Sequence, residues 1–397
     1  NIMMSLMMLS MAFVMITMSL ASGRRIAEVI NEQSDLVSPQ EALTEVKDGS
    51  IDFNHVVFSY KHGSGEAVLK DVDLHIKSGE TIGIIGGTGS AKSSLVNLIS
   101  RLYDVDEGSV VVGGQDVRNY DLEVLRDEVS VVLQKNVLFS GTILQNLRWG
   151  NENATEEECK EACRLACADE FIDRFEDGYN TYIEQGGSNV SGGQKQRVAI
   201  ARTLAINPKV LLLDEPFSNL DINLRNEMRE FVLNLQKKLN ITTILVTHDK
   251  EEALIMSDKI AVMVNGKIEQ FDKPETLYQK PRTKSVANIF GERNYIKGKI
   301  ENEVFKSNIL YIDAKGYNNL DIVEAMIPKE CIKLYSSNYN DGINGYIQRK
   351  QYAGDKTFYD ININGEILKC TSISNEYNQG DCVKICVDRD NIVFFPL

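Results

Sequence analysis

The sequence predicts an α/β fold with a mostly parallel sheet, preceded by one apolar helix and followed by a small all-β domain. Three observations support this prediction. Strand-like apolar runs alternate with helical segments between residues 49 and 285, which favours a parallel sheet covered by helices on both faces. Residues 2–22 carry no charge. Beyond residue 290, short strands separated by Gly and Asn turns replace the alternation.

Length and composition narrow the class of protein. The 397 residues are enough for two or three domains with sizeable cores. The net charge of −14 argues against a nucleic-acid partner, because such a partner usually requires a basic face. The seven cysteines show no CxxC spacing. This pattern fits a reducing compartment, where thiols stay free.

The first 22 residues are expected to be the end of a transmembrane helix. About 20 apolar residues span a bilayer as a helix, and the basic pair Arg24 and Arg25 places this end in the cytoplasm. A signal peptide is the alternative, but no basic region precedes the apolar run. A buried helix of a soluble protein is a further alternative. The first residue is Asn rather than Met, as in a fragment. A linker is expected over residues 23–48, with the helix continuing into its first part.

The central elements follow from hydrophobic periodicity. Strands are expected over 51–60, 68–76, 81–86, 128–134, 210–214, 241–247 and 259–264, and helices over 156–170 and 222–239. In the β domain of residues 290–397, the Asn-Gly pairs at 344–345 and 364–365 are expected to form tight hairpins.

Three cysteines lie four residues apart in the expected helix over 156–170. Cys159, Cys163 and Cys167 would share one helix face and could bind a metal. No His and no fourth Cys lies beside them, so a half-buried helix face is the favoured interpretation.

A glycine-rich segment follows the strand over 81–86 and opens a helix, as a phosphate-binding loop requires. Backbone N–H groups and a helix N-terminus favour phosphate there. Lys92 is expected to reach the β- and γ-phosphates, and Ser93 to bind Mg²⁺. The predicted nucleotide-binding residues of this segment are Gly86, Gly87, Thr88, Gly89, Ser90, Ala91, Lys92, Ser93 and Ser94. A structural glycine-rich turn is the alternative.

Ala91 departs from the phosphate-loop pattern, which has Gly before the Lys. If this position is already helical, the methyl group has little effect. If it needs a positive φ, nucleotide binding weakens. We expect near-normal binding, which corresponds to the first alternative.

Two carboxylates end the apolar strand VLLLDEP at 210–216. Asp214 is expected to hold Mg²⁺, directly or through water. Glu215 is expected to orient and deprotonate the attacking water. Adjacent side chains at a strand end point to different sides, so the two carboxylates can have separate roles. Solvated loop charges are the alternative.

The order GGTGSAKS, NVSGGQKQR and VLLLDEP resembles the ATP-binding cassette (ABC) family over residues 49–285. This resemblance implies a P-loop NTPase cassette with a helical subdomain, and hydrolysis of ATP with Mg²⁺ as cofactor when two cassettes close face to face. It implies that Gln134 senses Mg²⁺, that His248 contacts the γ-phosphate and that Tyr60 stacks on adenine. It also implies that Asp221 lies in a loop at the dimer interface. The residues Ser191, Gly192, Gly193 and Gln194 would contact the γ-phosphate held by the other cassette.

The two halves of the chain resemble different branches of this family. Residues 1–200 are similar to an exporter half-transporter, in which a last transmembrane helix runs into the cassette. Residues 203–397 are similar to importer ATPases for iron, polyamines or quaternary amines, whose C-terminal β domain is OB-like (TOBE). The switch falls near residues 197–205, so we expect a natural recombinant, a fusion or a misassembled gene.

The resemblance implies a subunit at the cytoplasmic face of the membrane that couples ATP-driven dimer closure to solute transport. Its expected partners are a second cassette in a homodimer or heterodimer, membrane permease subunits and a solute-binding protein. A soluble ABC protein of DNA repair or translation is one alternative, but no long coiled coil and no second cassette is present. An ATPase that is not coupled to transport is the other.

Overall fold

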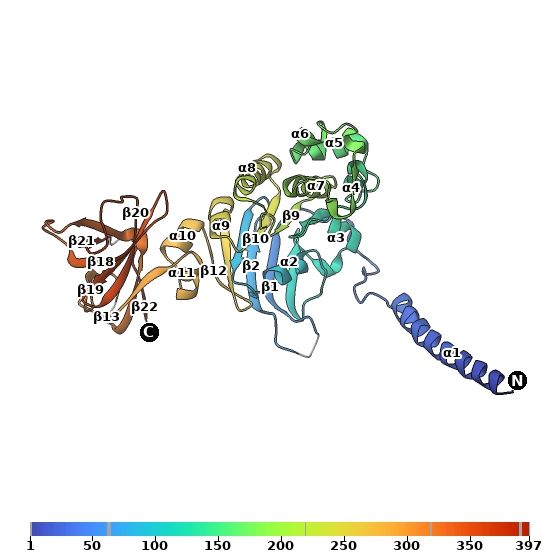
Figure 1. Cartoon of the computed structure of the whole chain (residues 1–397), viewed down its shortest axis with the longest axis horizontal. Coiled ribbons are helices and arrows are strands. Elements are labelled where there is room, and N and C mark those ends of the chain that lie inside the picture. Colours follow the sequence, from blue (N-terminus) through green and yellow to red (C-terminus); the bar gives the residue numbers. More distant parts are fainter. Residues whose placement is uncertain (1, 62–64, 219, 318–319, 389–390, 397) are drawn as a thin grey trace.

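The computed structural model describes residues 2–61, 65–218, 220–317, 320–388 and 391–396. Figure 1 shows an N-terminal helix, a central part of helices and sheets, and a C-terminal part made of strands. The predicted fold class is confirmed in all three parts. The N-terminal helix α1 (Ile2–Asn31) is exposed along its whole length. Within the described chain it is the helix that is long and apolar enough to cross a membrane.

A six-stranded sheet forms the centre, with the strand order β12-β11-β3-β10-β9-β6. All pairs in it are parallel except β11 with β12. Its strands are β3 (Thr81–Gly86), β6 (Val129–Val132), β9 (Val210–Asp214), β10 (Thr242–Thr247), β11 (Lys259–Val264) and β12 (Lys267–Asp272). The carboxyl ends of β3, β9 and β10 meet at one edge, where a doubly wound sheet places its ligands.

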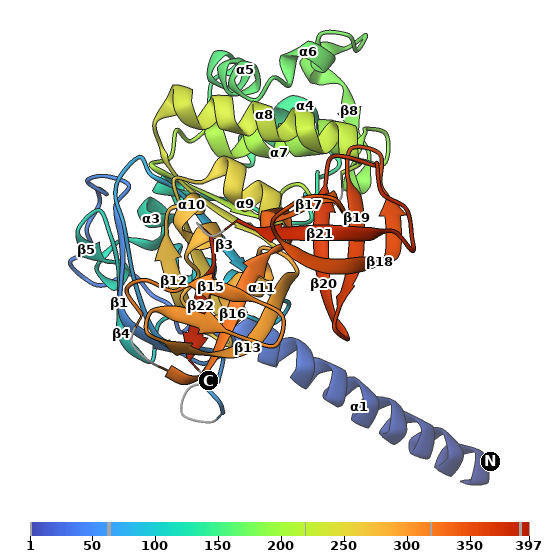
Figure 2. The same ribbon diagram turned by 90° about the vertical axis from the view of Figure 1, so that its left-hand side faces the viewer.

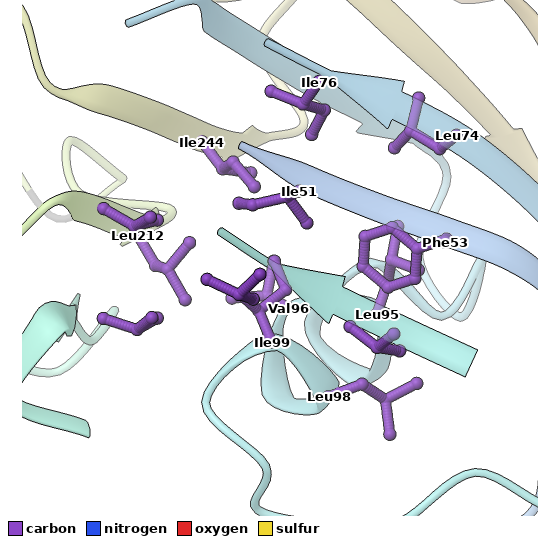
Figure 3. Close-up of a cluster of buried hydrophobic side chains, with 14 of the residues drawn as sticks. Ile51, Phe53, Leu74, Ile76, Leu95, Val96, Leu98, Ile99, Leu212 and Ile244 are labelled. Atoms are coloured by element: carbon purple, nitrogen blue, oxygen red, sulfur yellow. The ribbon is translucent and has the colours of Figure 1, made fainter. Parts of the chain in front are cut away.

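A second, antiparallel sheet covers one side of α2 (Lys92–Ile99). Its strands are β1 (Ile51–Phe58), β2 (Leu69–Ile76), β4 (Glu107–Val112) and β5 (Gln115–Asp116), in the order β2-β1-β4-β5. Figure 3 shows α2 side chains such as Leu95 and Ile99 beside Phe53 of β1 and Leu212 of β9. Because α2 is buried between two sheets, the loop at its N-terminus is held rigidly.

The other face of the parallel sheet is covered by helices (Figure 2). These are α4 (Ile143–Arg148), α5 (Glu156–Leu165), α6 (Asp169–Ile172), α7 (Gly192–Leu204) and α8 (Ile222–Leu239), with the short pair β7 (Gly141–Thr142) and β8 (Tyr182–Ile183) beside them. The prediction of one helix over 156–170 is wrong. Cys167 has φ 48° and separates α5 from α6. Cys159 and Cys163 are buried in α5, and the described residues contain no cluster of three or more His, Cys, Asp or Glu side chains that could hold a metal ion.

Helices α3 (Leu122–Glu128) and α9 (Lys250–Met256) belong to the cassette, and α10 (Pro274–Gln279) and α11 (Lys284–Ile289) connect it to the C-terminal part. The buried Arg293 at the start of β13 pairs with Glu330 at 3.0 Å and lies over the ring of Tyr278 from α10. Ala287 of α11 packs against Met326 and Phe395. The C-terminal strands are therefore packed directly against the cassette.

Two five-stranded antiparallel sheets form the C-terminal part. One contains β13 (Arg293–Glu301), β14 (Val304–Lys306), β15 (Tyr311–Asp313), β16 (Leu320–Pro328) and β22 (Val393–Pro396), and the other β17 (Ile332–Ser336), β18 (Ile343–Tyr352), β19 (Thr357–Ile363), β20 (Glu366–Ser372) and β21 (Cys382–Val387). The hairpin at Asn364–Gly365 is confirmed, since both residues have positive φ between β19 and β20. The hairpin expected at Asn344–Gly345 is wrong, because both residues lie inside β18.

The segment before β1 follows the surface of the cassette. The Ser38 hydroxyl accepts a hydrogen bond from the backbone of Leu122, and Leu43 pairs with Tyr120 as an isolated parallel bridge. Val46 is fully buried in the core around α2, and its carbonyl accepts a hydrogen bond from Lys209. The second part of the expected linker therefore packs as part of the cassette.

Candidate functional site

The phosphate-binding loop connects β3, which is buried throughout, to α2. Lys92 is 8% exposed, and its ammonium group donates hydrogen bonds to the carbonyls of Gly86 (2.9 Å) and Gly87 (3.1 Å). Burial lowers the pKa of Lys92, while the charges of Glu215 and Asp214 act in the opposite direction. The hydroxyl of Ser90 is buried and has no hydrogen-bond partner among the described residues. A phosphate oxygen in this loop would provide a partner for both groups.

Ala91 occupies the N-cap position of α2 with φ 73° and ψ 25°, in the left-handed region. The expectation that this position is already helical is therefore wrong, because the helix begins one residue later. A non-glycine residue in this region is disfavoured by about 1–2 kcal/mol. The strain is already present in the ligand-free loop. The strain therefore lowers the free energy of unfolding. It affects nucleotide affinity only if the backbone conformation of the loop changes when the nucleotide binds.

The predicted catalytic and metal-binding residues come together at the ends of four parallel strands, β3, β6, β9 and β10. The hydroxyl of Ser93 donates a hydrogen bond to Asp214 at 3.0 Å. The amide of Gln134 donates to Glu215 at 3.0 Å, and Nδ1 of His248 lies 3.1 Å from the same carboxylate oxygen. A cavity of about 550 Å³ is lined by Thr88, Gly89, Ser90, Ala91, Lys92, Ser93, Ser94, Gln134, Glu215 and His248. This volume suits a nucleotide triphosphate tail with its metal ion.

Asp214 is a suitable ligand for a divalent cation. Burial raises the pKa of Asp214, and the neighbouring Glu215 charge raises it further, while the hydrogen bond from Ser93 lowers it. A bound cation would offset both the burial of the Asp214 carboxylate and its repulsion by Glu215. The hydroxyl of Ser93, the carboxylate of Asp214 and the amide oxygen of Gln134 are the oxygen donors that Mg²⁺ prefers. The residues present therefore fit Mg²⁺.

Tyr60 lies at the edge of the phosphate-loop region rather than inside its cavity. The residue is 50% exposed, and its hydroxyl lies 2.8 Å from that of Ser94 on α2. An exposed ring tied to the phosphate-binding helix is compatible with stacking on a nucleotide base.

The residues Ser191 to Gln194 form the N-terminus of α7. Ser191 accepts a hydrogen bond from the backbone of Gln194, whose side chain accepts one from the backbone of Ser191, so the pair forms a capping box. Gly193 is buried, and a Cβ there would approach Leu224 to 2.7 Å. Ser191, Gly193 and Gln194 line a different cavity from the phosphate loop. Within the described chain, the structure therefore does not bring these residues to the phosphate loop.

Asp221 is the N-cap of α8 and accepts a hydrogen bond from the backbone of Leu224 at 3.0 Å. Asn219 of the same predicted loop lies outside the described residues.

Sequence reasoning missed the ion-pair cluster that holds the His248 segment. Arg229 of α8 contacts Asp249 at 2.8 Å and Glu252 at 3.1 Å. The buried Glu252 also accepts a hydrogen bond from Thr247, the last residue of β10. These contacts fix the loop between β10 and α9 that carries His248. Helical periodicity places Arg229 on α8 but does not reveal a partner twenty residues away.

Sequence reasoning also missed a link between the Gln134 segment and α7. The side chain of Asn136 donates a hydrogen bond to the buried Gln196, and Arg202 donates one to the carbonyl of Val137.

The sequence profile of the ABC transporter family matches residues 69–218. The chain is 31% identical over 344 residues to the Fe(3+) ions import ATP-binding protein FbpC of Fusobacterium nucleatum, covering 83% of this chain and 89% of that protein. It is 34% identical over 260 residues to the multidrug efflux ATP-binding/permease protein Rv0194 of Mycobacterium tuberculosis, covering 66% of this chain.

Among solved structures, a bacterial Atm1-family ABC exporter with ATP bound aligns with 68% of this chain at 31% identity and a TM-score of 0.60. The chain spans 46% of that exporter and 21% of the mycobacterial protein. Importer-type and exporter-type proteins are therefore both among its relatives, as the sequence predicted.

Proposed function

Because this chain belongs to the ABC transporter family of ATP-binding proteins, we propose that it hydrolyses Mg²⁺-bound ATP and couples this reaction to solute transport. The family hydrolyses ATP and acts together with membrane permease subunits. The observation that carries the proposal is the convergence of Lys92, Ser93, Gln134, Glu215 and His248 around one cavity at the ends of β3, β6, β9 and β10.

Each residue has a role that its surroundings support. Lys92, now bonded to loop carbonyls, would turn to the β- and γ-phosphates. Ser93, Asp214 and Gln134 would hold Mg²⁺, which neutralises phosphate charge when bound. Glu215 would accept a proton from the attacking water. His248, within hydrogen-bonding distance of Glu215, would contact the γ-phosphate.

The complete site is proposed to require two cassettes. Ser191, Gly192, Gly193 and Gln194 begin a 13-residue helix whose N-terminus favours anions, yet they lie at a different cavity from the phosphate loop of their own chain. A second cassette, identical or related, would bring its own copy of this helix end to the γ-phosphate. Asp221 would lie at the contact between the two cassettes.

The chain is proposed to act at the cytoplasmic face of the membrane. Residues 1–22 would lie in the bilayer, residues 49–285 would form the cassette and residues 290–397 a TOBE-like regulatory domain. One exposed apolar helix supports anchoring. A single helix cannot form a pathway, so permease subunits from other chains would supply it. A solute-binding protein would join only an import system.

The test is ATP hydrolysis by the purified full chain in detergent. Glu215→Gln should lower the rate by about 100-fold or more, as expected for loss of a general base. With ATP present it should accumulate as a dimer, measured by light scattering after gel filtration. Glu366→Gln, at the exposed start of β20, serves as the matched control and should leave both properties unchanged. Equal rates for wild type and Glu215→Gln would contradict the proposal.

An ATPase that is not coupled to transport is the second candidate. The mixed relatives favour it, because an importer ATP-binding protein matches over 83% of this chain while an exporter aligns with 68% of the same chain. Hydrolysis that no permease stimulates would support this second candidate.

A further inference from the structure

Three aromatic rings gather beside the phosphate-binding helix. Phe58, the last residue of β1, is buried, while Tyr60 and Tyr103 are 50% and 40% exposed. The ring centroids of Tyr60 and Tyr103 are 5.1 Å apart, and those of Tyr60 and Phe58 are 5.0 Å apart. Phe58 and Tyr103 are themselves 5.6 Å apart. The three rings therefore form one closed contact triangle.

The geometry of these contacts leaves room for a stacked base. The plane of Tyr60 makes an angle of 88° with Tyr103 and 74° with Phe58. Edge-to-face contacts of this kind hold a ring without stacking on it. Tyr60 as a whole residue is 50% exposed, which leaves surface of its side chain for a planar base.

Tyr103 is fixed to the same helix that begins with Lys92. The segment after α2 is closed by backbone hydrogen bonds from Arg101 to Leu98 and from Leu102 to Asn97. Arg101 also pairs with Asp104 at 2.9 Å. The N-terminal half of α2 contributes a second contact, because the hydroxyl of Ser94 lies 2.8 Å from that of Tyr60.

We propose that Tyr103, together with Ser94, is a positioning residue that sets the orientation of the Tyr60 ring for the nucleotide base. The phosphate loop joins α2 at the N-terminus of this helix. Through the contacts with Ser94 and Tyr103, the same helix also fixes the ring of Tyr60. The base and the triphosphate are thereby held at a constant separation. This inference depends on the proposed function, since it assumes that the cavity at Lys92 binds the triphosphate.

The experiment compares two ligands, MgATP and inorganic tripolyphosphate with Mg²⁺, which has no base. Binding to the full chain in detergent is measured by calorimetry. An edge-to-face pair contributes enough to change affinity by about 3- to 10-fold. We expect Tyr103→Ala to weaken ATP binding by about this factor and to leave tripolyphosphate binding unchanged. The KM for ATP should rise while kcat is retained.

Tyr103→Phe keeps the ring and should bind both ligands like the wild type. If Tyr103→Ala does not fold, Tyr103→Leu takes its place, because it retains apolar volume. Equal weakening of both ligands, or unchanged ATP binding, would overturn the role of Tyr103. A wild type that binds neither ligand would instead contradict the proposed function itself.

Discussion

Replacing Ala91 with glycine should measure the backbone strain in the phosphate loop. Ala91 has φ 73° and ψ 25°, a conformation that disfavours alanine by about 1–2 kcal/mol relative to glycine. The substitution also removes a half-buried methyl group and increases the freedom of the unfolded chain, and both effects lower stability. A single variant would therefore give only the sum of opposing contributions.

Ala205 provides the matched control. It ends α7 with φ −62° and ψ −18°, in the right-handed region, and is also half-buried against the core. Ala205→Gly loses the same methyl group and gains the same unfolded-state freedom, but it relieves no strain. The difference in unfolding free energy between the two variants should therefore be about 1–2 kcal/mol, with Ala91→Gly the more stable.

The assay is thermal unfolding of the full chain in detergent, where this difference corresponds to roughly 2–4 °C in the Tm of the cassette. Because the strained conformation exists before nucleotide binds, the ATP Kd of Ala91→Gly should stay within about twofold of the wild type. Equal Tm values for the two variants would refute the strain argument. A tenfold gain in ATP affinity would show that the alanine hinders binding directly.

Three further predictions follow from the charges of the site and from the mixed relatives. Asp214→Asn should stabilise the ligand-free protein by about 1 kcal/mol in urea unfolding while abolishing hydrolysis. Because burial raises the pKa of Asp214, the folded state binds its proton more tightly than the unfolded state. The wild type therefore gains stability as pH falls, and the stability advantage of Asp214→Asn should shrink as pH approaches the ordinary carboxyl range. A stability gain that does not depend on pH would contradict this cause. Arg229→Ala leaves Glu252 buried without its cation and should destabilise the fold by about 3–5 kcal/mol in urea unfolding. The double variant Arg229→Ala/Glu252→Gln should recover part of this loss. No recovery in the double variant would argue against the ion pair. The segment between Gln134 and Ser191 is part of the region that resembles exporters. Importer permeases reconstituted with this chain in vesicles should therefore show little ATP-driven transport. Robust uptake of solute into these vesicles would contradict this expectation.

The sequence alone predicted the features that depend on local chain order. The apolar strands that run into GGTGSAKS and VLLLDEP lie in one parallel sheet, and their ends bring Ser93 to Asp214. The carboxyl ends of parallel strands share one edge, so strand order alone brings these residues together. The families that the motifs resemble were also confirmed among the relatives.

Features that depend on distant parts of the chain could not be predicted in this way. The two Asn-Gly pairs of the C-terminal part have the same local signal, yet Asn364–Gly365 forms a hairpin and Asn344–Gly345 lies inside a strand. Gly345 lies within β18, where a Cβ would approach Ile385 and Ile361 to less than 3 Å, and these partners are remote in sequence. The left-handed conformation of Ala91 likewise depends on how the loop meets α2, which residue type alone does not reveal.

The attachment of residues 38–48 to the cassette limits how far the ATPase can move from the bilayer. Helix α1 ends at Asn31 and the first contact with the cassette is made by Ser38, so only the stretch 32–37 is free to extend. A fully extended chain of this length reaches about 20 Å, and the helical residues 23–31 beyond the proposed membrane segment add about 13 Å. An anchored α1 would therefore confine the nucleotide site to a thin layer beneath the membrane, where the search for a second cassette becomes two-dimensional.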